Sequence, residues 1–184
     1  SNGRPNLIFV LTDQQRQDSM ACYGNEWVST PNLDALAGQS FVFDNAYVTQ
    51  PVCTPARSSI MTGLYPQTTG VVRNGIPLDR DSKTIAEMVS HDYMCAHLGK
   101  LHLGDDLVAQ HGFEYWVSMD KVHSVDALPD AARHLEPDYF KFLRDSGVEP
   151  PTDSYEAWAA SAGLQEGLTP AAFLGQEAAR FIGD

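Results

Sequence analysis

The sequence predicts an α/β fold in which helices cover both faces of a mostly parallel central sheet. Short apolar runs rich in branched residues alternate with segments that carry helix-start signals, which is the pattern of consecutive βαβ units. The strand-like runs are residues 6–12, 40–48 and 93–98. Helix starts are predicted from a cap residue followed by proline, or from a capping box, at Thr30-Pro31, Thr54-Pro55, Thr84 with Glu87, and Thr169-Pro170.

Length and charge set limits on function. The 184 residues are 43% hydrophobic, which is enough for one domain over residues 1–184 with a substantial core. A net charge of -12 argues against nucleic acid and anionic membranes as partners, and no apolar run is long enough to cross a membrane. We expect a soluble protein, either cytoplasmic or, after removal of a signal peptide, periplasmic or secreted. Oligomeric state stays open.

The segment from residue 52 to residue 63 carries the strongest chemical signal. Thr54 suits a helix N-cap, Pro55 suits the first helical position, and Gly63 suits a left-handed helix end. Cys53 then lies at the positive end of a short helix, with Arg57 one turn inside. This placement predicts an acidic, reactive thiol. The chain has three cysteines in a spacing unlike a zinc or disulfide framework, so at least one thiol is free.

Asp13 and Gln14 follow the predicted strand over residues 6–12. Ligands of open α/β sheets bind at the carboxyl ends of the strands. A carboxylate and an amide at this edge are therefore candidate oxygen ligands for a hard cation. The alternative is that Asp13 only caps the following turn, and the sequence pattern leaves both possibilities open.

The segment Gly99–Gly104 follows the predicted strand over residues 93–98. If the segment is extended, Lys100 and His102 point to one side while Leu101 and Leu103 point to the other. A lysine and a histidine at a strand end suit oxyanion binding and proton transfer. The alternative is a pair of solvent-facing polar residues.

The remaining segments carry weaker signals. The loop after residue 63 is rich in turn formers and offers Arg73 and Asn74 as polar candidates, or is simply solvated. Residues 105–165 are predicted to form an insertion on the functional edge, with a packed aromatic turn at 111–116 and a helix at 138–144. Four histidines without ligand-like spacing are assigned to structure or solvent: His97, His111, His123 and His134.

The last predicted helix, residues 169–182, presents an apolar face. Its members are Phe173, Leu174, Ala178, Phe181 and Ile182. A crossover helix in a parallel sheet leads to another strand, and none follows here. We therefore expect the catalytic domain to be incomplete at its C-terminus.

Two motifs in this order resemble the N-terminal part of the type I sulfatases, in the alkaline-phosphatase-like superfamily. The segment C-T-P-A-R from Cys53 to Arg57 matches the C-x-P-x-R signature, and G-K-L-H-L-G resembles G-K-W-H-L-G with Leu101 replacing tryptophan. Asp13 after the first strand and the T-P-N-L-D-A-L-A helix agree with this order. The resemblance covers most of residues 5–116, resumes at 169–182 and implies an alkaline-phosphatase-like fold.

The resemblance also implies a chemistry. Cys53 would be converted to formylglycine by a maturation enzyme, and the hydrated aldehyde would supply the nucleophile that attacks the sulfur of a small-molecule or carbohydrate sulfate ester. Asp13, Gln14 and residue 53 would bind a divalent cation, expected to be Ca²⁺.

Roles for the other polar residues follow from the same resemblance. Arg57 would hold the modified side chain and its oxyanion. Lys100 would neutralise the sulfate oxygens, and His102 would position the diol or assist its breakdown. Asn74 lies where related phosphonate and phosphodiester hydrolases place a substrate contact.

Departures from the family pattern keep other functions open. Gln14 replaces a second aspartate and is typical of choline-sulfatase-like and phosphonate-monoester-hydrolase-like members, so a phosphonate monoester or phosphodiester is an alternative substrate. Family members continue past residue 184 with further metal ligands, a lysine and a histidine, so we expect the isolated segment to be inactive. A non-catalytic remnant that binds sulfated ligands is the third possibility. A cysteine phosphatase would need a longer loop between Cys53 and Arg57.

Overall fold

The computed structural model describes residues 3–119, 135–150 and 163–183. The chain forms two compact units, Ser1–Tyr47 and Val48–Asp184. A single domain over residues 1–184, with an insertion at 105–165, stays a prediction. In the described ranges, no helix has both the length and the apolar character needed to cross a membrane.

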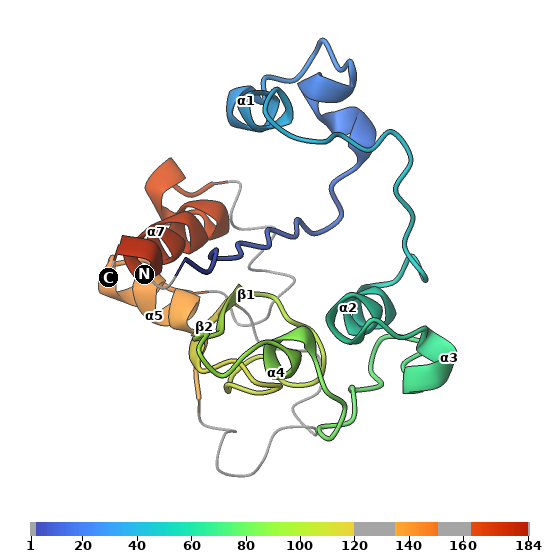
Figure 1. The fold of residues 1–184 in the computed structure, drawn as a ribbon. Coiled ribbons are helices and arrows are strands. Elements are labelled where there is room, and N and C mark those ends of the chain that lie inside the picture. Colours follow the sequence, from blue (N-terminus) through green and yellow to red (C-terminus); the bar gives the residue numbers. More distant parts are fainter. Residues whose placement is uncertain (1–2, 120–134, 151–162, 184) are drawn as a thin grey trace. The chain divides into compact units, whose positions relative to one another are not determined.

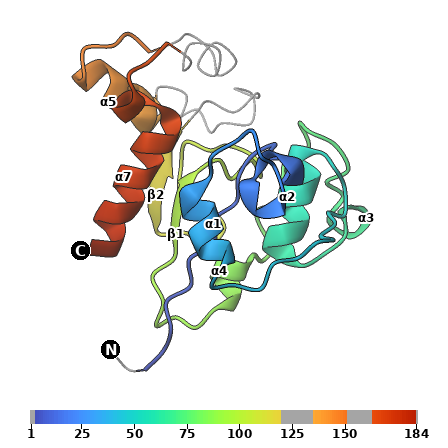
Figure 2. The ribbon, with the colours of Figure 1, turned by 90° about the horizontal axis from the view of Figure 1, so that it is seen from above.

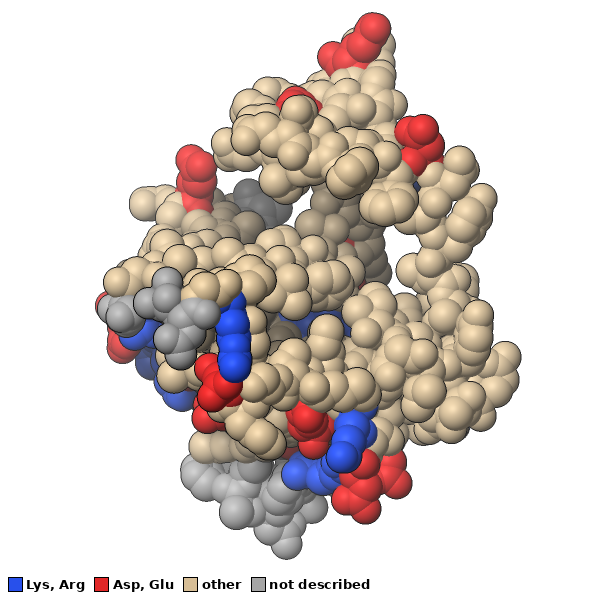
Figure 3. Space-filling view, in the orientation of Figure 1, with Lys and Arg blue, Asp and Glu red and all other residues tan. Residues whose placement is uncertain are grey.

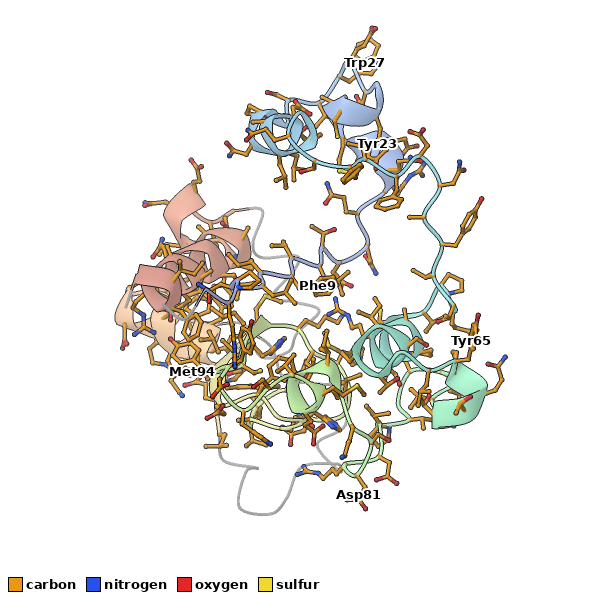
Figure 4. All side chains as sticks on the ribbon, in the orientation of Figure 1. Phe9, Tyr23, Trp27, Tyr65, Asp81 and Met94 are labelled. Carbon is orange, nitrogen blue, oxygen red and sulfur yellow. The ribbon has the colours of Figure 1, made fainter. Side chains whose placement is uncertain are left out.

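The N-terminal unit contains two 3-10 helices and one α-helix: η1 (Gln17–Ser19), η2 (Ala21–Tyr23) and α1 (Pro31–Ala37). The predicted helix after Thr30 is thereby confirmed, and it ends at Gly38 as expected. The Thr30 hydroxyl accepts the amide of Ala21 at 3.0 Å and donates to the Asp34 carboxylate at 3.0 Å. The first bond ties α1 to η2, and the second lies within the first turn of α1. Figure 4 shows the labelled Tyr23 and Trp27 in the same unit.

The strands predicted at residues 6–12 and 40–48 are wrong for the structure described here. Both runs are irregular, and their apolar side chains are exposed, for example Phe9 at 60% and Phe41 at 96%. A β-strand needs a neighbour that accepts and donates its backbone hydrogen bonds, and no described segment pairs with either run. An apolar run alone indicates a candidate strand, while the partner decides whether a strand forms.

The second unit contains a parallel sheet of two strands, β1 (Ala96–Gly99) and β2 (Tyr115–Ser118). The strand predicted at 93–98 is partly confirmed, since β1 begins three residues later than expected. The pattern at 111–116 predicted only an aromatic turn, so β2 was missed. The predicted α/β class with a parallel sheet is confirmed (Figure 1).

Side chains of the two strands alternate between two apolar clusters. Leu98 and its partner Val117 contact one cluster, whereas Trp116, paired with His97, contacts the other. The first cluster joins β2 to helices α5 (Asp138–Asp145) and α7 (Pro170–Gly183), which lie together beside the sheet in both ribbon views (Figures 1 and 2). The buried members of the first cluster are Val117, Met119, Tyr139, Phe140, Leu143 and Phe173. Those of the second are Val71, Leu78, Leu101 and Leu103, with Met61 of α2 packed against them.

The helices of the second unit follow their local signals. Helix α4 (Ile85–Met88) has the predicted capping box, in which the Thr84 amide donates to Glu87 at 3.0 Å. Helix α3 (Pro66–Thr69) begins at a proline within the turn-rich loop. Helix α7 confirms the last predicted helix, although Ile182 on its expected apolar face is exposed.

Candidate active site

The helix that carries the cysteine motif, α2 (Cys53–Thr62), begins two residues before Pro55, the predicted first helical residue. Thr54 is therefore not the N-cap. Val52 holds that position without a side-chain bond, and the oxygen that caps the helix comes from Asn74, whose Oδ1 accepts the Thr54 amide at 2.9 Å. Gly63 ends the helix in a left-handed conformation with φ 72°, as predicted.

The first turn of α2 has few amide donors left for an anion. The Thr54 amide is bound to Asn74, Pro55 has no N–H, and the Ala56 amide bonds to the Val52 carbonyl at 3.0 Å. Cys53 is half-buried at the positive end of the helix. Within the described part of the chain, its own amide is the first-turn donor that remains for a ligand.

Arg57 connects the two sequence motifs. Its side chain is buried, and Nη1 donates a hydrogen bond to the backbone carbonyl of Lys100, 43 residues away in the chain. The guanidinium group lies one turn inside α2, and Lys100 directly follows β1. The C-x-P-x-R motif and the G-K-L-H-L-G motif therefore meet in the folded unit.

His102 lies beyond Lys100 in a conformation that the sequence did not predict. Its φ is 58°, so the chain is not extended at this residue and the simple alternation of sides fails there. Leu101 and Leu103, which were expected on the side opposite Lys100 and His102, are both completely inaccessible to solvent. His102 is itself buried.

Asp106 is a site neighbour that sequence reasoning missed. Its carboxylate oxygens accept the His102 amide at 2.8 and 3.0 Å, and its side chain is fully buried. Its carbonyl accepts Trp116 Nε1 at 2.9 Å. The pair Asp105-Asp106 just after the glycine of the motif was the available signal, but a pair of acidic residues alone predicts a solvated turn as readily as a buried carboxylate.

His97 packs against the aromatic rings of Phe113 and Trp116. Its ring lies 4.6 Å from that of Trp116 and 5.6 Å from that of Phe113, between ring centroids. Burial lowers the pKa of His97 to about 4, the Gly99 carbonyl opposes this shift, and the nearby Arg57 charge adds to it. His97 is therefore neutral near pH 7. Together with the buried His111 it has the structural role predicted, while His123 and His134 lie outside the described residues.

Asp13 and Gln14 lie in the N-terminal unit, whereas Cys53 lies in the second unit. Gln14 has a left-handed backbone, with φ 58°. Within residues 3–119, 135–150 and 163–183, no group of three or more His, Cys, Asp or Glu side chains could hold a metal ion. The carboxylate and the amide suit a hard cation in kind, but they supply too few oxygens for a complete site.

The distribution of charge on the surface bears on how an anion could be attracted to this protein. The acidic side chains visible in Figure 3 lie in several separate places, and most of that face is neither acidic nor basic. With a net charge of -12, attraction of an anion depends on nearby groups such as Arg57 and Lys100.

Comparison with known proteins assigns the family. The sequence profile described as Sulfatase matches residues 5–147, most of the chain. The chain belongs to the sulfatase family. An ulvan-active sulfatase of Formosa agariphila is 37% identical over 134 residues, which is 68% of this chain and 26% of that protein. An N-acetylglucosamine-6-O-sulfatase of Bacteroides thetaiotaomicron is 30% identical over 139 residues, 75% of this chain and 23% of that protein.

Solved structures give the same fold. A protein in complex with its substrate D-glucosamine-2-N,6-O-disulfate has 33% identity and a TM-score of 0.57, covering 61% of this chain and 22% of that one. The phosphonate monoester hydrolase of Agrobacterium radiobacter has a TM-score of 0.72 over 98% of this chain and 38% of that one, with 24% identity. The sulfatase chain thus spans about a quarter of the length of the curated relatives that it matches.

Proposed function

We propose that the protein carrying this chain hydrolyses a sulfate monoester, with residue 53 as the nucleophile after its conversion to formylglycine. The contact between Arg57 and the Lys100 carbonyl carries this proposal, because it joins the two motifs in one place beside Cys53. Relatives named as sulfatases of ulvan and of N-acetylglucosamine support a sulfated carbohydrate as the substrate class.

The modification is an oxidation at the Cβ of Cys53. A maturation enzyme removes the thiol as hydrogen sulfide, water supplies the aldehyde oxygen, and an external oxidant accepts two electrons and two protons. The hydrated aldehyde then supplies the oxygen nucleophile for attack on sulfur. Cys53 suits this role because it is half-buried at a helix start, where the helix dipole favours a developing negative charge.

The chain's own cations and histidine then bind and orient the ester. Arg57, held by the Lys100 carbonyl, stabilises negative charge beside residue 53. The Lys100 ammonium binds the sulfate oxygens. His102 positions the hydroxyls of the nucleophile or moves a proton during their breakdown.

Asp13, Gln14 and residue 53 are the proposed ligands of a divalent cation, with Ca²⁺ the expected ion. When bound, the cation supplies electrostatic stabilisation of the ester oxygens. Calcium takes about six to eight oxygen ligands, so further ligands are expected from sequence beyond residue 184. We therefore expect the purified 184-residue chain to be inactive, and robust turnover of an aryl sulfate by this chain would contradict the assignment of the missing ligands.

Gln14 favours a second candidate function, hydrolysis of a phosphonate monoester or phosphodiester at the same site. The comparison that tests the two is kcat/KM for an aryl sulfate and a matched aryl phosphonate, measured on the full-length protein matured with a formylglycine-generating enzyme. We expect the sulfate to be preferred and Cys53→Ala to abolish its turnover. Preference for the phosphonate would establish the second function, and no turnover of either ester by matured protein would favour a ligand-binding remnant.

A further inference from the structure

The backbone of His102 has a conformation that side-chain-bearing residues rarely adopt. Its φ of 58° lies in the left-handed region, which a non-glycine residue occupies only when its surroundings hold it there. Leu101 and Leu103 on either side are completely buried in the second apolar cluster. The two buried leucines hold the chain on both sides of His102. The conformation of His102 between them then depends on the hydrogen bonds of its own backbone.

Asp106 provides that binding. Both of its carboxylate oxygens lie within hydrogen-bond distance of the His102 amide, at 2.8 and 3.0 Å. A carboxylate accepts an N–H more strongly than a neutral oxygen does. The side chain is 1% exposed, so solvent does not compete for this bond.

Asp106 is itself tied to the sheet. Trp116 of β2 donates its indole N–H to the Asp106 carbonyl at 2.9 Å. Trp116 also packs against His97, its partner in β1. The position of the carboxylate is therefore set by the strand pair β1–β2, and Lys100 directly follows β1, so both polar residues of the motif are placed by the same sheet.

We propose that Asp106 is a positioning residue that fixes His102 in the orientation used by the reaction. The role of His102 in the reaction rests on the proposed function, while the contact itself rests on the geometry. In this role Asp106 acts through the backbone of His102.

The neighbouring residue offers a matched control. Asp105 is also buried, at 4% exposure, and its carboxylate accepts the Leu107 amide at 2.8 Å and lies 3.6 Å from Arg80. Its carboxylate does not bond to His102 among the described contacts. Substitution of either aspartate removes a buried carboxylate and can lower stability. Only substitution of Asp106 also removes the hydrogen bonds to the His102 amide.

The test uses the full-length matured protein. Asp106→Ala is expected to lower kcat by about 10-fold to 100-fold with KM within about twofold, because a misplaced catalytic group slows the chemical step more than binding. Asp106→Asn keeps one acceptor oxygen and is expected to recover kcat to within about threefold of the wild type. Asp105→Ala is expected to change kcat by less than about twofold, even if it lowers Tm.

Two further measurements separate positioning from general damage. In a His102→Ala background, Asp106→Ala is expected to have no further effect on kcat, since its effect is transmitted through His102. Equal losses of kcat with and without His102 would overturn the proposal, as would equal effects of the two aspartate variants.

The contact between Asp106 and the His102 amide can be measured without an activity assay. The backbone amide of His102 is expected to exchange with deuterium at least about tenfold faster in Asp106→Ala than in Asp105→Ala. An unchanged exchange rate would overturn the proposal. An inactive wild-type protein with selectively faster exchange would instead refute the proposed function while supporting the positioning contact.

Discussion

The bond from Asn74 to the first turn of α2 gives a prediction that distinguishes capping from substrate contact. The Thr54 amide that it accepts belongs to a residue that is 2% exposed, so loss of the acceptor leaves a buried donor without a partner. Loss of an N-cap costs about 0.5–2 kcal/mol, and an unsatisfied buried donor costs about 1–3 kcal/mol. We expect Asn74→Ala to destabilise the first turn by about 1.5 kcal/mol.

Hydrogen–deuterium exchange of peptides covering residues 53–62 measures this loss directly. A local cost of about 1.4 kcal/mol corresponds to a tenfold change in the opening equilibrium, so exchange in Asn74→Ala is expected to be about tenfold faster. Asn74→Asp keeps an acceptor oxygen and places a negative charge at the positive helix end, so its exchange is expected to match the wild type. Arg73→Ala on the same exposed loop is the control.

Activity of the same variants tests the substrate contact. If Asn74 also contacts the ester, Asn74→Asp is expected to raise KM, because its charge repels an anionic substrate, although the helix stays capped. Exchange in Asn74→Ala within about twofold of the wild type would refute the capping argument.

Three further predictions concern His97, Arg57 and Asp13. The pKa of His97 is lowered to about 4, so its contribution to stability is complete above about pH 6.5 and is lost as pH falls toward 4, by up to about 3 kcal/mol. His97→Phe is expected to flatten the profile of unfolding free energy against pH, and parallel profiles would contradict this assignment. Arg57→Lys keeps the charge but loses the guanidinium bond to Lys100, and is expected to lower kcat/KM of the full-length protein by about 10-fold to 100-fold. A kcat/KM equal to the wild type would show that charge alone suffices. Removal of divalent cations by a chelator is expected to abolish turnover and added Ca²⁺ to restore it, and Asp13→Ala is expected to raise the Ca²⁺ concentration required; activity that survives chelation would contradict the metal assignment.

Local signals predicted local structure well. The start of α1 after Thr30, the capping box of Thr84 and the left-handed end at Gly63 are each determined by a few adjacent residues. The start of α2 was displaced by two residues, because the capping oxygen comes from Asn74 in a distant loop. No pattern within the motif itself specifies that bond.

Strands were predicted less well because they depend on a partner. The run over residues 6–12 is apolar and branched, yet it forms no strand among the described residues. The segment Tyr115–Ser118 is short and follows an aromatic turn, yet it forms β2 because it pairs with β1. Pairing is a long-range property, and periodicity in one sequence does not report it.

In the candidate site, too, the residues of the motifs could be predicted from the sequence, whereas a long-range contact could not. The motifs predict Cys53, Arg57, Lys100 and His102 as site residues, because their residue types and order are specific. The Arg57 contact with the Lys100 carbonyl brings the motifs together, as a shared site requires. The bond from His102 to Asp106 was not predictable, since it depends on a left-handed turn between two buried leucines.

The chemical state of residue 53 tests the central claim most directly. The measurement is the mass of the tryptic peptide that ends at Arg57, taken from full-length protein produced with a formylglycine-generating enzyme, beside a sulfatase known to be matured in the same cells. We predict the mass of an aldehyde in place of the thiol, and turnover of an aryl sulfate that rises with the modified fraction. An unmodified Cys53 beside a fully modified control, or turnover that is unchanged in Cys53→Ala, would contradict the account.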